Sequence, residues 1–277
     1  MTRPKPTGAA MSRIPRPASP GAFFALVLAL AIPFWMLSAA TGIELLPGLP
    51  IAALAVVCPA LAGLILAWRE GGRGRALGLL ARGVDVRRIP GAGVWAAALL
   101  IPLGVAAACW LLAFEGGAGI PAPQIALARG LGLAAVFLVC AISEELGWSG
   151  YALDPLQARW GSLRGALILG AVWAAFHYIP LAQAHRPLAW VAWWSLGTVS
   201  MRVIMVWLYN RAGGSVFAVS LFHMSANLAW QLYPVSGSWF DPRSHGLLMA
   251  LIAAIAVLAW PSRGLASRRP PQPVRSR

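Results

Sequence analysis

Five ionisable side chains lie inside otherwise apolar stretches of this 277-residue chain: Glu144, Glu145, His177, Arg202 and His223, with the amide of Asn227 four residues after His223. A carboxylate beside an imidazole can take a proton from water, and an imidazole with an amide can donate hydrogen bonds to a developing oxyanion. Peptide hydrolysis without a covalent nucleophile needs these groups. Since the sequence has no GxSxG motif and no cysteine with an evident activating partner, we predict no serine or cysteine nucleophile.

These residues lie in apolar runs of the length that a helix needs to cross a hydrocarbon core, about 20 residues. The sequence contains such runs at 22–41, 45–68, 93–114, 126–153, 165–182, 188–209, 214–231 and 245–261. We therefore predict an all-α, polytopic integral membrane protein with about eight transmembrane helices. In a helix, His223 and Asn227 share one face because they are four residues apart.

Composition supports a membrane protein. Hydrophobic residues make up 59% of the chain and charged residues 11%, whereas soluble domains carry roughly 25% charged residues. The net charge of +14 would suggest a nucleic-acid partner in a soluble protein. Here the basic residues gather between the apolar runs, so we predict the lipid bilayer as partner and no nucleic acid.

The basic residues also predict the orientation. Most lie in the N-terminal tail, in the connection 69–88 and in the C-terminal tail, whereas the alternate connections hold Arg186 and Arg243. Cytoplasmic connections carry the excess of Lys and Arg, so we predict that both termini are cytoplasmic and that the protein resides in a bacterial inner membrane. In the connection from Arg69 to Pro90, the stretch GLLARGVDVRR is either a short helix on the cytoplasmic headgroups or part of a solvated linker.

We predict one transmembrane domain, 22–261, between disordered basic cytoplasmic tails 1–21 and 262–277, whose composition cannot support a folded core. His185 and His245 fall in non-cytoplasmic connections and are expected to be ordinary surface residues.

The depth of the polar residues predicts a common site. With a rise of about 1.5 Å per residue, Glu144 and His223 lie roughly 14 Å and His177 roughly 18 Å from the cytoplasmic ends of their runs. Ionisable groups inside a bilayer are costly and are functional candidates by default. We expect these three side chains to line one buried polar cavity that opens toward the cytoplasm.

Three segments resemble motifs of the CPBP family (CAAX-protease and bacteriocin-processing proteins, also called Abi) of intramembrane proteases. EELGWS, beginning at Glu144, is similar to the family's EExxxR; WAAFH, from Trp173 to His177, is similar to its aromatic-xxx-His; HMSAN, from His223 to Asn227, is similar to its Hxxx(Asn). The resemblance covers about residues 130–230.

The resemblance implies roles for the motif residues. Glu144 would be the general base that activates water, assisted by His177, with His223 and Asn227 supporting the oxyanion and Trp173 supporting the site. Family members cleave membrane-associated substrates, and the eukaryotic branch cleaves prenylated proteins after the CAAX cysteine. The implied substrate is therefore a membrane-associated or prenylated peptide or protein.

The chain departs from the family pattern at Ser149, which occupies the position of the motif arginine. Glu145 would then lack its partner, and an unpaired buried carboxylate is strongly destabilising. Arg202, inside the sixth apolar run, is a candidate replacement for the missing motif arginine. We hypothesise that it pairs with Glu145. The alternative is that Arg202 extends to the cytoplasmic interface.

Two other functions and a cofactor stay open. An inactive family member could act as an immunity or partner-binding protein, and an ion-coupled transporter would also bury Glu and His residues, although we find no repeat symmetry of the kind common in transporters. Glu144, His177 and His223 could supply three ligands to a catalytic zinc ion. The sequence has no HExxH pair, and the same residues also suffice without a metal.

Overall fold

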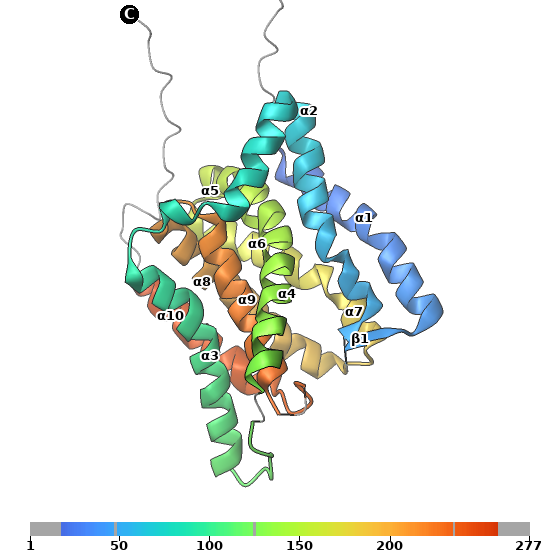
Figure 1. Cartoon of the computed structure of the whole chain (residues 1–277), viewed down its shortest axis with the longest axis vertical. Helices are drawn as coiled ribbons and strands as arrows, with labels where there is room; N and C mark the ends of the chain where they lie inside the picture. The colour runs from blue at the N-terminus through green and yellow to red at the C-terminus, as the bar shows by residue number, and fades with distance from the viewer. Residues whose placement is uncertain (1–17, 47–48, 124–125, 235, 260–277) are drawn as a thin grey trace, which may run out of the picture.

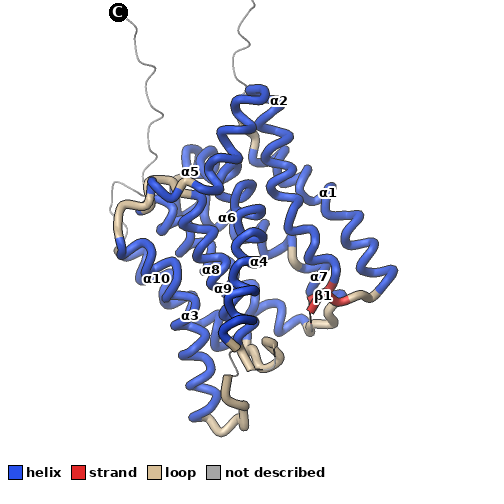
Figure 2. Tube along the Cα trace, viewed as in Figure 1, coloured by secondary structure: helices blue, strands red, loops and turns tan. Residues whose placement is uncertain are grey.

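The computed structural model describes residues 18–46, 49–123, 126–234 and 236–259, and nearly all of them are helical (Figures 1 and 2). The first half comprises α1 (Pro20–Thr41), β1 (Glu44–Leu46), β2 (Leu49–Pro50), η1 (Ile51–Val57), α2 (Cys58–Ala81), η2 (Arg82–Val84), η3 (Val86–Arg88) and α3 (Ala92–Glu115). The second half comprises α4 (Leu127–Glu145), η4 (Leu146–Leu153), α5 (Asp154–Trp160), α6 (Ser162–Phe176), α7 (Tyr178–Gln183), α8 (Leu188–Arg211), α9 (Val216–Leu232) and α10 (Pro242–Leu258). The two strands form one short antiparallel hairpin.

The helices confirm an all-α integral membrane protein. Within the described residues, six helical stretches are long and apolar enough to cross a membrane, namely 20–41, 51–84, 92–115, 127–160, 162–183 and 188–211. The two remaining apolar runs form α9 and α10, which have 17 residues each. The count of eight spanning helices and the cytoplasmic placement of the termini stay predictions.

The predicted end of the fourth run was wrong. The fourth run was expected to end at 153, but the chain continues helically to Trp160. Pro155 does not break the chain here, because Leu153 and Asp154 before it keep right-handed helical dihedrals and η4 runs directly into α5. The fifth run is interrupted at His177, between α6 and α7.

The predicted tails lie largely outside the described residues, although α1 begins at Pro20, within the expected N-terminal tail. His185 is exposed, as predicted. The prediction for His245 was wrong: this residue lies in α10 and is half-buried, with its ring centroid 5.0 Å from that of Phe240. Gly197 of α8 lies close to the same imidazole.

The connection from Arg69 to Pro90 is largely helical and bonded to the bundle rather than a solvated linker, and its place relative to the headgroups stays a prediction. Figure 1 shows α2 folding back on itself, at Gly71 and Gly72, which have non-helical dihedrals. The Arg82 guanidinium then donates hydrogen bonds to the Gly150 carbonyl, the Tyr209 hydroxyl and the Gly214 carbonyl. These bonds anchor the connection to η4, to α8 and to the turn before α9.

The packing brings the motif-bearing helices together. α9 packs against α3 and α4, α8 packs against α6 and α10, and η4 packs against α2. Figure 1 shows α4 and α9 side by side near the centre of the bundle. The polar residues of α4, α6, α8 and α9 can therefore meet in the interior.

Gly147 allows the closest of these approaches. A Cβ at this position would lie 2.2 Å from the carbonyl oxygen of Pro59 at the start of α2, closer than packed atoms can lie. We expect Gly147→Ala to destabilise the protein by about 1–3 kcal/mol, because the backbones must separate. Thermal unfolding in detergent measures this effect. Gly104→Ala in α3, where a Cβ meets no atom within 4 Å, is the control, and an equal midpoint for the two variants would contradict the expectation.

Candidate active site

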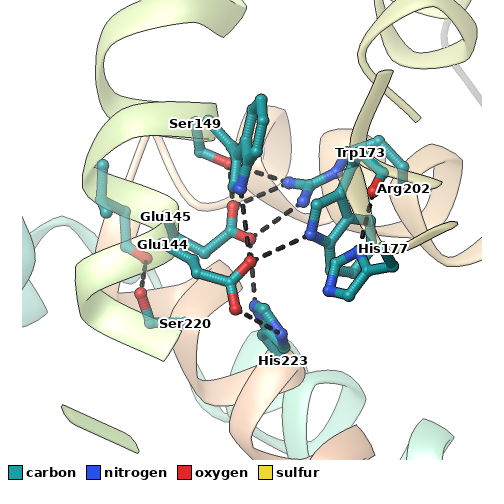
Figure 3. Close-up of polar contacts among 10 residues, drawn as sticks. Glu144, Glu145, Ser149, Trp173, His177, Arg202, Ser220 and His223 are labelled. Atoms are coloured by element: carbon teal, nitrogen blue, oxygen red, sulfur yellow. Dashed lines mark hydrogen bonds and ion pairs between the residues drawn. The ribbon is translucent and has the colours of Figure 1, made fainter. Parts of the chain in front are cut away.

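The two adjacent glutamates lie where the geometry of the fourth helix changes. Glu144 and Glu145 are the last residues of α4, and the next eight residues, Leu146–Leu153, form a π-helical segment that is entirely buried. Segments of π-helix are rare and frequently occur at functional sites. Figure 3 shows both carboxylates among side chains from α6, α8 and α9.

The hypothesis that Arg202 pairs with Glu145 is confirmed. Arg202 Nη1 lies 2.7 Å from Glu145 Oε2, and Nη2 lies 3.0 Å from Oε1, so the contact is bidentate. Both side chains have 0% exposure, which makes the interfacial alternative wrong. Ser149 donates its hydroxyl to the same carboxylate, and the guanidinium lies 4.2 Å from the ring centroid of Trp173. An arginine on α8 thus occupies the role expected of the motif position.

His223 is oriented by this ion pair. Its Nδ1 lies 3.1 Å from Glu145 Oε1, so the imidazole donates its Nδ1–H to a carboxylate that Arg202 already holds in place. A neutral imidazole that donates from Nδ1 carries its lone pair on Nε2. That Nε2 lies 3.9 Å from Glu144 Oε1. Glu145 therefore positions His223, and His223 faces Glu144.

Glu144 is held by two indole groups. Its Oε2 accepts hydrogen bonds from Trp173 Nε1 at 3.0 Å and from Trp148 Nε1 at 3.3 Å, and the residue is 6% exposed. Both donors are neutral, so the carboxylate is satisfied without an ion pair, and Oε1 points toward His223. Our sequence reasoning gave no role to Trp148. Its position four residues after Glu144, one helical turn away, was the available signal.

His177 and Asn227 lie at the edge of the cluster. His177 is half-buried, its Nδ1 lies 2.8 Å from the Trp173 carbonyl oxygen, and its ring faces Trp194. Asn227 is half-buried on α9, one turn beyond His223. Within the described residues, no hydrogen bond joins either side chain to Glu144. The structure thus brings together Glu144, Glu145, Trp173, Arg202 and His223, and the cavity open to the cytoplasm stays a prediction.

The three candidate metal ligands Glu144, His177 and His223 are not grouped around one point in this arrangement. In the part of the chain that the structure describes, no three His, Cys, Asp or Glu side chains are grouped so as to hold a metal ion. The Nδ1 atoms of His177 and His223 and Oε2 of Glu144 are hydrogen-bonded within the protein, which leaves Nε2 of each imidazole and Oε1 of Glu144 as the remaining donor atoms. A zinc ion at these residues stays a prediction.

Comparisons with known proteins agree with the motifs. Residues 126–229 match the model of the family described as type II CAAX prenyl endopeptidase Rce1-like. The chain is also 27% identical over 110 residues to a protein of Methanococcus maripaludis named CAAX prenyl protease 2. That similarity covers 36% of this chain and 40% of the relative. Together with the helical membrane fold, both findings support the assignment of this chain to the CPBP family of intramembrane proteases.

Proposed function

We propose that this protein is an intramembrane endopeptidase and that Glu144 activates the water that hydrolyses a peptide bond. The observation that carries the proposal is the 3.9 Å separation between Glu144 Oε1 and His223 Nε2. One water can donate an O–H to each of two acceptors at this spacing, with hydrogen bonds of ordinary length. Its oxygen lone pairs then face a substrate carbonyl.

The chemical step follows from this geometry. The water oxygen bonds to the carbonyl carbon while one water proton moves to Glu144, and the protonated Glu144 returns that proton to the leaving nitrogen as the C–N bond breaks. In this proposal, His177 assists Glu144 and Asn227 donates to the oxyanion. With its lone pair on Nε2, His223 orients the water in this step, so the oxyanion donor of the proposal is Asn227.

The proposed substrate is a prenylated or otherwise membrane-tethered peptide. Support comes from the apolar helices around the cluster and from the name of the family model and of the archaeal relative. The match covers 40% of that relative. The substrate class is therefore proposed here and does not follow from the match.

The test is cleavage by the full chain in proteoliposomes. A farnesylated CAAX peptide and a palmitoylated peptide of the same sequence are incubated with wild type and with Glu144→Gln in heavy-oxygen water, and the products are identified by mass spectrometry. We expect cleavage by wild type with one heavy oxygen in the new carboxylate. Equal cleavage by wild type and Glu144→Gln would overturn the proposal. Cleavage of neither peptide would also overturn it and would favour a partner-binding role.

Chelation is expected to leave the activity intact. The described donors do not form a three-ligand group, so the proposed step depends on the carboxylate and imidazole alone. Cleavage is measured before and after exhaustive treatment with a chelator, with a known zinc protease in the same vesicles as a positive control. Activity that disappears with chelator and returns with zinc would show that the site gathers a metal in its working state.

A further inference from the structure

A cavity of about 590 Å³ lies at the end of the bundle where α4 begins and α9 ends. Its walls include Pro121, Arg129, Gly130, Leu133, Gln231 and Tyr233. Gln231 is eight residues along α9 from His223, which corresponds to about 12 Å of helix. The cavity is therefore separate from the glutamate and histidine cluster, although α4 and α9 contribute to both.

Two buried polar side chains in the cavity wall have unused hydrogen-bonding groups. Gln231 and Tyr233 are each 4% exposed, and neither the amide oxygen and nitrogen of Gln231 nor the hydroxyl of Tyr233 has a hydrogen-bond partner within the described residues. A buried polar group without a partner costs about 1–3 kcal/mol, so such groups require an explanation. Both residues line the cavity, so a ligand bound there is a candidate partner for these groups.

Arg129 makes the cavity suitable for an anion. Its guanidinium is exposed and donates one hydrogen bond, at 3.0 Å, to the Ser236 hydroxyl, which leaves further N–H groups available. Ser236 lines the same cavity and has a φ of 57°, a left-handed conformation that is strained for serine. Among the described residues, the cavity wall contains no carboxylate, so the positive charge lacks a counter-ion there.

The exposed apolar residues beside the cavity favour a lipid phosphate as the anion. Leu127 and Leu131, one turn apart at the start of α4, are 74% and 63% exposed, as expected for side chains that face acyl chains. Arg129 lies between them in the first turn of α4, and a long basic side chain near the end of a membrane helix can extend to the headgroups. We propose that this cavity binds the phosphate group of an anionic phospholipid, with Arg129 as its cation and Gln231 and Tyr233 as hydrogen-bonding groups. The proposal does not depend on the proposed proteolytic activity.

The test is lipid-dependent thermal stability of the purified full chain in a neutral detergent. Phosphatidylglycerol, phosphatidylcholine and inorganic phosphate are added separately to wild type, Arg129→Gln, Gln231→Leu and Arg243→Gln. Arg243 is an exposed arginine just after the same end of α9 and outside the cavity, so its variant is the matched control. At saturating phosphatidylglycerol we expect the midpoint of wild type and Arg243→Gln to rise by about 5 °C.

Arg129→Gln and Gln231→Leu should lose most of this rise, and neither phosphatidylcholine nor inorganic phosphate should produce it in any variant. If phosphatidylglycerol raises the midpoint of Arg129→Gln as much as that of wild type, the proposed site is wrong. A rise lost equally in Arg243→Gln would show a general surface-charge effect and would also overturn it. An equal rise of the midpoint with inorganic phosphate would contradict a phospholipid as the ligand and would identify a site for free anions.

Discussion

Glu144→Gln is expected to lower the rate of peptide cleavage by at least about 100-fold, the lower bound for losing a general base. Glutamine has the shape of glutamate, and its carbonyl oxygen can still accept from Trp148 and Trp173, which bond to Glu144 Oε2 in the wild type. The amide cannot take a proton from water. Substrate binding should change little, so the loss should appear in kcat rather than in KM. Initial rates on the tethered peptides in proteoliposomes measure both.

Glu115→Gln is the matched control. Glu115 is exposed at the end of α3 and contributes nothing to the cluster, so its variant should cleave at the wild-type rate. Glu144→Gln must also unfold at the wild-type temperature, so that the lower cleavage rate reflects the missing base rather than a misfolded protein. A folded Glu144→Gln protein with more than about a tenth of wild-type activity would show that another group takes the proton.

Arg202→Met is expected to destabilise the protein by about 3–5 kcal/mol, the range for removing one partner of a buried ion pair. Methionine fills much of the space, so the main cost is the Glu145 carboxylate left at 0% exposure with only the Ser149 and His223 contacts. Chemical unfolding in detergent measures the loss. Arg164→Met, at an exposed position of α6, should leave the stability unchanged.

Two double variants separate charge from packing. Adding Glu145→Gln to Arg202→Met removes both charges and should recover part of the lost stability, because no buried ion is then left unpaired. Adding Ser149→Arg returns an arginine to the position where the family motif has it, one helical turn from Glu145. Recovery in both would establish that Arg202 serves as the counter-ion of Glu145. An Arg202→Met protein that unfolds at the wild-type midpoint would contradict this role.

Local patterns in the sequence were sufficient to predict the helices and several partners. Apolar runs of membrane-spanning length indicated an all-α membrane protein, and the structure confirms helices in all of them. The Arg202–Glu145 pair was predictable because a charge in an apolar interior needs a counter-charge, and few candidates existed. The motif order indicated the family, which the comparisons support over residues 126–229.

Tertiary structure decided how the site is assembled. Hydropathy does not define how far each helix rotates about its axis, so the sequence could not tell that His223 faces Glu144 while His177 turns toward its own backbone and Trp194. The same uncertainty concealed Trp148, whose indole reaches Glu144 within a π-helical segment. The prediction for His245 was wrong for a related reason. In the sequence alone, the first turn of a helix resembles a loop, and the packed neighbours that bury His245 are not visible. Spacing along one helix is a local property, whereas contacts between helices depend on packing of the whole bundle.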